Sequence, residues 1–388
     1  MLRRLKSHPH LTYYLSYLAS ELCFGTNGTA YGPMIPYLSE QTGIPETGYS
    51  FLFSCRSFGM LLGAFLLKLL QKRAQCTLHQ YITIASVAIL FFNILFSLTL
   101  DPFFQGLWLF LGAIFYSFRA IAVGISVILI NPHQDMEFFL LLCHGSYGVG
   151  GLLGPLFVYL FEINTVVVSG LLVTLVSIKI MRLESPETFE SKKEEEDGGR
   201  KSAPWQAEYL LVFILFLYIG MEYDYQGWIS SYATISHVSS KEHATVFPMI
   251  FWVVMTLSRF GYSMLPGSSS QKMSQALIAT VVCGVISLLF INMDWVLFTC
   301  YLSAVMFGLS MANMYPLTFS IPSEFGWRLN EHQANNIISG GVIGEGVLTM
   351  ITGKLMDWLF IDMLFVFIIG VAVVMWLCRG LCLTYLAQ

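Results

Sequence analysis

Seven ionisable side chains interrupt long apolar stretches of the chain, where no water would surround a charge. They are four acids and three arginines, namely Glu21, Arg56, Arg119, Glu222, Asp224, Arg259 and Glu345. A charge at the centre of a bilayer is costly unless it is paired or faces water. An acid there can bind and release a proton or a sodium ion, so these residues are candidates for ion or substrate binding. The near balance of acids and arginines also suits structural ion pairs.

Uncharged polar and aromatic side chains accompany these charges in the apolar stretches. They are Asn27, Tyr31, Gln226, Trp228, Asn335 and Asn336. Aromatic planes beside amide groups suit a neutral polyhydroxylated molecule, because they offer stacking and hydrogen bonds without a net charge. Free arginines would instead suit an anion. Helix packing is the alternative role for each aromatic ring.

Two acids near the middle of the chain compete for the role of coupling group. Glu222 and Asp224 lie two residues apart, about 200° around a helix axis, so both cannot face one cavity. We favour Glu222, because Glu21 occupies the matching place in the first half of the chain. His144, beside a glycine-rich run, could relay protons or simply form a structural hydrogen bond.

The composition identifies the setting of these residues. Of 388 residues, 56% are apolar or aromatic and 11% are charged, and the mean hydropathy is +0.67. These values exclude a disordered chain, a fibrous repeat and a nucleic-acid binder. One helical crossing of a bilayer needs roughly 20 apolar residues. We therefore predict an all-α polytopic protein in the lipid bilayer with twelve transmembrane helices, over 12–38, 48–70, 78–99, 105–130, 137–161, 164–182, 207–234, 244–265, 274–292, 295–320, 333–356 and 359–385.

The basic residues predict the orientation of these helices. Of the 20 lysines and arginines, 15 fall on the side of the N-terminus and two on the opposite side. Because basic residues concentrate in cytosolic loops, we expect both termini in the cytosol. The polar stretch from Glu184 to Pro204 separates six predicted helices from six. This division gives an N-terminal bundle over 1–183, a cytosolic linker over 184–206 and a C-terminal bundle over 207–388.

The two halves also look duplicated. Glu222 follows Glu21 by 201 residues, and Arg259 follows Arg56 by 203 residues. Glycines cluster in both halves as well, at 148–154 and at 340–346. Parallel repeats with a substrate site between them near the bilayer midplane are typical of secondary transporters. Glycine-rich helix faces allow close packing and sliding.

Three motifs resemble a known family. They lie between Gly25 and Leu38, between His144 and Pro155, and between Gly220 and Tyr232. With the six-plus-six arrangement, they are similar to the major facilitator superfamily, and within it to the branch of sodium-dependent glucose transporters and fucose–proton symporters. The resemblance implies a rocker-switch mechanism of alternating access, a sugar-like substrate and coupling to an ion.

These observations favour a secondary active transporter of a small polar organic solute, coupled to H⁺ or Na⁺ through Glu21, Glu222 or Glu345. No P-loop, HExxH or GxSxG motif occurs, and the glycines at 148–154 lie inside an apolar helix. We therefore expect no enzyme activity, no cofactor and no metal site.

Two other functions stay open. The superfamily's signature motif between the second and third predicted helices is represented only by Gly63 and the basic pair Lys72 and Arg73, without its acid. A transporter-like structural subunit or receptor of a larger membrane complex is therefore the first alternative. The abundance of Phe and Met, 31 and 18 residues, suggests a carrier of lipids or other amphiphiles as the second.

Overall fold

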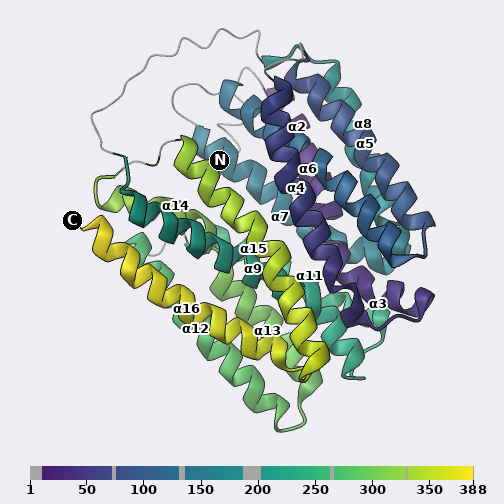
Figure 1. The fold of residues 1–388 in the computed structure, drawn as a ribbon, viewed down its shortest axis with the longest axis vertical. Coiled ribbons are helices and arrows are strands. Elements are labelled where there is room, and N and C mark those ends of the chain that lie inside the picture. The colour runs from purple at the N-terminus through teal and green to yellow at the C-terminus, as the bar shows by residue number, and fades with distance from the viewer. Residues whose placement is uncertain are drawn as a thin grey trace. The chain divides into compact units, whose positions relative to one another are not determined.

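The computed structural model describes residues 11–71, 76–130, 136–186, 202–262, 266–327, 329 and 331–387. Most of these residues form α-helices joined by short turns (Figure 1). The helices belong to two compact units. The first unit comprises residues 1–30 and 58–194, and the second comprises residues 31–57 and 195–388.

The first unit is built from helices of the N-terminal half of the chain. They are α2 (Leu11–Gly28), the part of α4 (Phe51–Gln71) from Phe58 onward, α5 (Leu78–Leu98), α6 (Pro102–Ile130), α7 (Met136–Phe161) and α8 (Thr165–Met181), with the 3-10 turn η2 (Glu162–Asn164) between the last two. Helix α2 packs against α7 and α8, and α5 packs against α6 and α8. A capping box at Thr77 and Gln80 starts α5 by satisfying backbone N–H groups that have no partner inside the helix.

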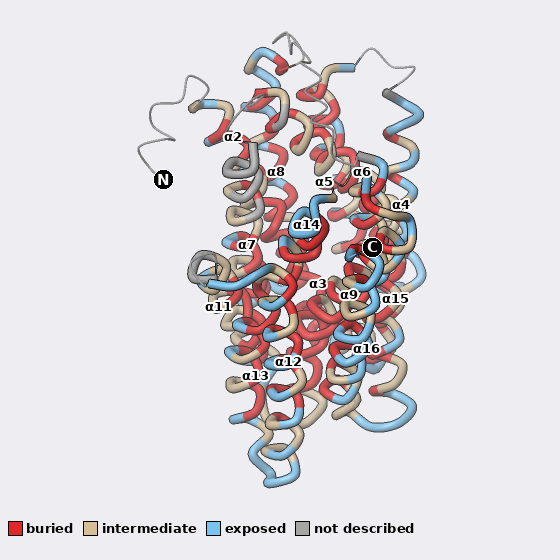
Figure 2. The backbone as a smooth tube through the Cα atoms, turned by 90° about the vertical axis from the view of Figure 1, so that its left-hand side faces the viewer, coloured by how far each residue is buried: buried red, intermediate tan, exposed pale blue. Residues whose placement is uncertain are grey.

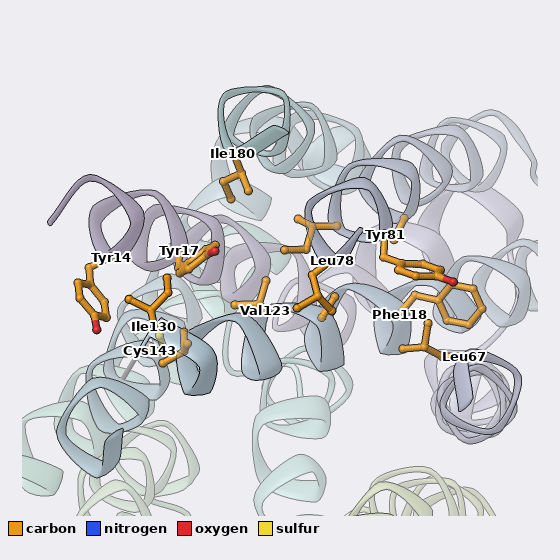
Figure 3. Close-up of a cluster of buried hydrophobic side chains, with 14 residues drawn as sticks. Tyr14, Tyr17, Leu67, Leu78, Tyr81, Phe118, Val123, Ile130, Cys143 and Ile180 are labelled. Carbon is orange, nitrogen blue, oxygen red and sulfur yellow. The ribbon is translucent and has the colours of Figure 1, made fainter. Parts of the chain in front are cut away.

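A hydrophobic cluster fills the interior of the first unit (Figure 3). It draws side chains from several helices, including Tyr17 of α2, Leu78 of α5 and Val123 of α6. Tyr17 also shares a hydrogen bond of 2.7 Å with Nε2 of His79. Because its hydroxyl has a partner, this tyrosine can be buried among apolar side chains.

The second unit contains helices from both halves of the sequence. They are α3 (Tyr31–Thr42), the 3-10 turn η1 (Glu46–Ser50), the start of α4, α9 (Trp205–Ile235), α10 (Lys241–Ala244), α11 (Val246–Tyr262), α12 (Ser269–Ile291), α13 (Val296–Met311), α14 (Met314–Glu324), α15 (Glu331–Trp358) and α16 (Met363–Leu386). Helix α9 packs against α15, α16 and α3. The boundaries of this unit fall inside the first two predicted spans as well as in the central polar stretch, because residues 31–57 pack with α9 and α15.

Helices occupy all twelve segments that the sequence predicts to cross the membrane, within the residues that the structure describes. The first and tenth segments are each divided into two helices, α2 and α3 in one and α13 and α14 in the other. Each break lies four residues before a proline, since Thr29 precedes Pro33 and Ala312 precedes Pro316. Proline cannot donate a hydrogen bond to the carbonyl four residues earlier, and its ring clashes with that carbonyl. Hydropathy therefore locates these segments, and proline determines where they break.

The helices are also apolar on faces that lie outside the protein interior. On α5, the exposed Ile84, Val87 and Phe91 follow a helical spacing, while Ile82 and Ile89 are buried. Figure 2 shows buried and exposed residues alternating in the same way along α12 and α16. Among the residues that the structure describes, eight stretches are long and apolar enough to cross a membrane. A helix that is apolar on every side suits a lipid environment.

Candidate functional site

Arg119 and Glu21 form a buried ion pair in the first unit. The guanidinium of Arg119 donates hydrogen bonds to a carboxylate oxygen of Glu21 at 3.1 Å and to the hydroxyl of Ser20 at 2.6 Å. It also lies 4.1 Å from the centre of the Phe24 ring. The arginine side chain is completely buried, whereas that of Glu21 keeps 14% of its area exposed. Because α6 carries the arginine and α2 carries the acid, the pair joins these two helices.

Arg56 forms a second buried ion pair, with Glu345, in the second unit. The two side chains are 5% and 4% exposed. The guanidinium carbon lies 5.9 Å from the centre of the Tyr31 ring and 5.6 Å from that of Tyr223, so both rings are placed for a cation–π interaction. Arg56 and Tyr31 of segment 31–57 thus meet Tyr223 of α9 and Glu345 of α15.

Glu222 on α9 interacts with Arg259 on α11 in the second unit. The hydroxyl of Tyr218, one turn earlier on α9, donates a hydrogen bond to the carboxylate of Glu222, and Arg259 interacts with that carboxylate electrostatically. The Nε atom of Arg259 donates to the carbonyl oxygen of Ala312 at 2.9 Å. Pro316 leaves this carbonyl without its usual helical donor. The break between α13 and α14 therefore supplies the acceptor that orients Arg259.

The duplicated charges have different partners in the two halves. Glu21 pairs with Arg119 on α6, whereas its counterpart Glu222 interacts with Arg259 on α11. Arg56, the counterpart of Arg259, pairs with an acid on α15. Arg56 and Arg119 therefore each form an ion pair within their own unit, whereas the partly buried Arg259 interacts with Glu222 electrostatically.

Asp224 has a different environment from Glu222, as expected from their separation around the helix. It is fully buried, and neither carboxylate oxygen has a hydrogen-bond partner among the described residues. The hydroxyls of Thr349 and Thr352 on α15 lie close enough to interact with the carboxylate, although neither forms a hydrogen bond of normal geometry with it. Asp224 therefore faces α15, and Glu222 faces α11.

The amide and indole groups expected to bind a solute take part in helix packing. The amide nitrogen of Asn27 donates to the Val166 carbonyl at 3.1 Å and to the Ser169 hydroxyl at 2.7 Å. On α9, the side-chain oxygen of Gln226 accepts a hydrogen bond of 2.9 Å from the indole of Trp252. The indole of Trp228 likewise donates to the carbonyl of Thr349 at 2.9 Å.

The remaining predicted site residues lie apart from the buried charges. Asn335 and Asn336 occupy the first turns of α15, more than two helical turns before Glu345. The amide of Asn336 donates to Glu208 on α9 at 2.7 Å, and Asn335 is exposed. His144 belongs to α7, and its side chain lies outside the described part of the structure.

In each unit a glycine-rich helix packs closely against a neighbouring helix. Gly150 of α7 lies against the backbone of α2, and Gly344 of α15 lies against the backbone of α9 at Phe216. A Cβ atom at either position would collide with a backbone carbonyl oxygen. The first predicted helix and its counterpart, the seventh, thus pack in the same way, as the proposed duplication requires.

Sequence reasoning missed several residues that complete these groups. Tyr218 lies four residues before Glu222, and Thr349 lies four residues after Glu345. Residues four apart share a helix face, so a search for polar side chains one turn from each acid would have found both. Ser20 had no such signal, because it is adjacent to Glu21 and faces the same arginine only through the packing of α6.

Apolar helices that run through a membrane, arranged around buried acids and arginines, define an integral multi-pass membrane protein of the transporter class. The chain belongs to the Major Facilitator Superfamily, whose family model matches residues 17–328. No curated protein sequence matches the chain.

Solved structures share the fold at low sequence identity. A bacterial homologue of the human lysosomal transporter Spinster, in an inward-facing and unoccupied conformation, is 12% identical over 96% of this chain and 98% of its own, with a TM-score of 0.73. A variant of the nucleoside transporter NupG is 11% identical over 95% of this chain and 99% of its own, with a TM-score of 0.74. A POT family transporter in complex with a thioalcohol-conjugated peptide is 12% identical over 97% of this chain and 96% of its own, with a TM-score of 0.75. At these identities the likeness concerns the fold alone.

Proposed function

We propose that this protein is a secondary active transporter that moves a small polar organic solute by alternating access, with coupling to H⁺ or Na⁺. The observation that carries the proposal is the burial of acids and arginines inside helices of a transporter fold. Such groups are rare within a membrane and mark ion or substrate pathways. The coupling acid is Glu21, Glu222 or Glu345, and Glu21 is the most accessible of the three.

A sugar-like molecule is the favoured solute. The support is the group formed by Tyr31, Tyr223, Arg56 and Glu345, which combines two aromatic rings with charged hydrogen-bonding groups. Aromatic faces stack on apolar sugar surfaces, and charged side chains bind hydroxyl groups. Proteins of the same fold include a nucleoside transporter and a transporter bound to a peptide conjugate, so nucleosides and peptides are the next solutes to test.

The contacts of segment 31–57 suggest which part of the protein changes between the two states. Lys241 on α10 forms an ion pair with Glu40 on α3, and the hydroxyl of Thr47 donates to Asp357 on α15 at 3.0 Å. These contacts join the stretch between the first two predicted spans to the C-terminal half of the chain. In a rocking mechanism the two repeats separate alternately on each side of the membrane. We infer that these contacts form in one state and break in the other.

Uptake into proteoliposomes tests the proposal. The purified full-length protein would be reconstituted and offered labelled sugars, nucleosides and peptides, with and without H⁺ and Na⁺ gradients. We expect saturable uptake that rises with one gradient and loses its gradient dependence in Glu222→Gln. Glu162→Gln, which changes an exposed acid in the turn η2, is the matched control and should leave uptake unchanged. Flux that is non-saturable and independent of both gradients would contradict the proposal.

The second candidate function is a structural subunit or receptor with a transporter fold. The observation that favours it is that both fully buried arginines, Arg56 and Arg119, form ion pairs and that the partly buried Arg259 interacts with Glu222, so these charges could serve stability alone. This function predicts that the protein copurifies with fixed partners and that Glu222→Gln has no effect on its activity. A monodisperse particle without partners in mild detergent would count against it.

A further inference from the structure

Asp224 is the buried acid that the ion pairs leave without a positive partner. Within the interior of the second unit, Arg56 pairs with Glu345 and Arg259 interacts with Glu222. The ion pairs formed by the described residues do not include Asp224. Its carboxylate is fully buried, and both oxygens have no hydrogen-bond partner in the described parts of the chain. An isolated carboxylate in such a place is strongly destabilising unless a cation neutralises it.

The two threonines near the Asp224 carboxylate come from one face of α15. The indole of Trp228, one turn after Asp224, donates to the Thr349 carbonyl at 2.9 Å, and the side chain of Thr349 reaches Gly227. Thr352 follows Thr349 by three residues, so both threonines project from the same face of α15 toward α9. Lys354 lies about 200° around the helix from Thr352 and therefore projects from a different face.

The two threonine hydroxyls behave differently from most buried hydroxyls of this protein. Thr26, Thr83 and Thr318 each donate a hydrogen bond of 2.8–3.0 Å to the carbonyl four residues earlier in their own helices. The hydroxyls of Thr349 and Thr352 are buried and make no hydrogen bond with any described residue. Instead they lie near the Asp224 carboxylate. One carboxylate and two hydroxyls thus face one another without bonding directly.

We propose that Asp224, Thr349 and Thr352 form a binding site for Na⁺ between α9 and α15. These oxygen atoms are hard donors of the kind that bind alkali and alkaline-earth cations. One carboxylate balances one monovalent cation, whereas a divalent ion would leave an excess positive charge in apolar surroundings. A proton needs only one carboxylate oxygen and would not require two threonine hydroxyls to turn toward the acid. The role of this site in coupling rests on the proposed function, but the binding of Na⁺ does not.

Thermal unfolding of the purified full-length protein in nanodiscs tests the site without any transported solute. NaCl would be titrated against choline chloride at constant ionic strength, because a ligand that binds only the folded protein raises its unfolding temperature. We expect Na⁺ to stabilise the wild type in a saturable manner and to have no effect on Asp224→Asn. In the doubly substituted Thr349→Val, Thr352→Val, the half-saturating Na⁺ concentration should rise about tenfold or more, equivalent to about 1.4 kcal/mol of binding free energy.

Two controls separate loss of the site from loss of folding. Thr318→Val removes a buried hydroxyl of the same unit that bonds only to its own helix, so it should keep the wild-type response to Na⁺. Thr349→Ser keeps the hydroxyl and should also retain it. If Asp224→Asn does not give a monodisperse protein, the threonine variants still decide the matter. An unchanged Na⁺ response in the double valine variant would overturn the proposal.

The outcomes also distinguish this site from the proposed function. Saturable Na⁺ stabilisation that depends on Asp224, without solute uptake, would support the site and contradict transport. Coupled uptake driven by a proton gradient, with no effect of Na⁺ on stability, would support transport and overturn the Na⁺ site. Stabilisation by K⁺ equal to that by Na⁺ would also overturn the site as proposed.

Discussion

Arg119 is fully enclosed by protein, so Glu21, Ser20 and the Phe24 ring must compensate its charge. Breaking a buried ion pair by removing one partner leaves the other charge uncompensated and costs about 3–5 kcal/mol. We therefore expect Glu21→Ala to lower the free energy of unfolding by about that amount, somewhat less if water reaches the cleared space. Chemical denaturation in detergent micelles, followed by tryptophan fluorescence, measures this change.

The ion pair between Glu40 and Lys241 is the matched comparison. Its glutamate side chain is 63% exposed, so Lys241→Ala should cost no more than about 1 kcal/mol. Replacing both members of the buried pair, as in Glu21→Gln with Arg119→Met, should restore most of the stability lost in Glu21→Ala. Equal effects of Glu21→Ala and Lys241→Ala would show that the buried pair has no special role.

The charged residues inside the membrane spans could be recognised from the sequence, but their interaction partners could not. The apolar sequence around Arg56, Arg119 and Arg259 places all three in predicted membrane spans, whatever the fold. Their partners depend on which helix faces meet, and the structure gives the duplicated acids Glu21 and Glu222 partners on different helices. The helical angle between Glu222 and Asp224 predicts different environments for the two acids. It does not predict which of them meets an arginine.

At the scale of elements, the break between α13 and α14 connects proline to a buried charge. Pro316→Ala would supply an N–H group to the Ala312 carbonyl, in competition with the Nε atom of Arg259. A hydrogen bond to a charged group contributes about 1.5–3 kcal/mol. If Arg259 takes part in coupling, we expect gradient-driven uptake to fall roughly tenfold, with unchanged expression and monodispersity.

Pro102→Ala is the control for this substitution. Pro102 is the first residue of α6. At this position a backbone N–H group would have no acceptor within the helix, so the alanine adds no new helical hydrogen bond. Uptake by this variant should match the wild type. Wild-type uptake in Pro316→Ala would mean that the orientation of Arg259 by the helix break has no part in transport.

The close approach of α9 and α15 depends on a glycine. Gly344→Ala would place a Cβ atom against the Phe216 carbonyl oxygen, so the two backbones would have to move apart. Overpacking of this kind typically costs about 1–3 kcal/mol. Gly370→Ala on α16 has open space around the new methyl group, and it should be neutral or stabilising by up to about 1 kcal/mol. Thermal unfolding of the two variants side by side checks the difference, and similar midpoints for both would contradict it.

Hydropathy predicts where the membrane-spanning helices lie, but it does not predict where they break or end. A bilayer demands about 20 apolar residues per crossing, and this signal is strong in α5, α12 and α16. The predicted spans ignore the prolines at 33 and 316, since hydropathy does not register a missing N–H group. Helix α15 is not among the strongly apolar stretches, although its glycines at 340–346 match those at 148–154 in the first half.

At the scale of the whole molecule, sequence duplication and compact packing divide the chain differently. The duplication predicts bundles that meet at the central polar stretch, whereas residues 31–57 pack with residues of the C-terminal half. Both divisions are compatible if the segment changes partners during a transport cycle. The sequence could not predict such a change of partners. The duplication reflects the common origin of the two halves, whereas the structure shows a single conformation. The two divisions together therefore point to the contacts of this segment as the part that must rearrange.

Cross-linking tests that rearrangement. Glu40→Cys with Lys241→Cys, treated with a short cleavable bifunctional thiol reagent, would hold α3 to α10. Native thiols that are not buried, at Cys55, Cys76 and Cys378, would first be replaced by serine. Because transport requires the contacts to break, we expect cross-linked protein to lose solute uptake and to recover it when the reagent is cleaved. Each single-cysteine variant, treated identically, should keep its uptake.

The extent of cross-linking can be measured independently of transport. A protease site introduced between residues 184 and 204 would let the two halves separate on a denaturing gel unless the reagent joins residue 40 to residue 241. Full uptake by a sample in which nearly all halves remain joined would show that α3 and α10 stay together throughout the cycle. In that case the contacts of segment 31–57 would be a permanent part of the fold, and the rearrangement would have to lie elsewhere in the protein.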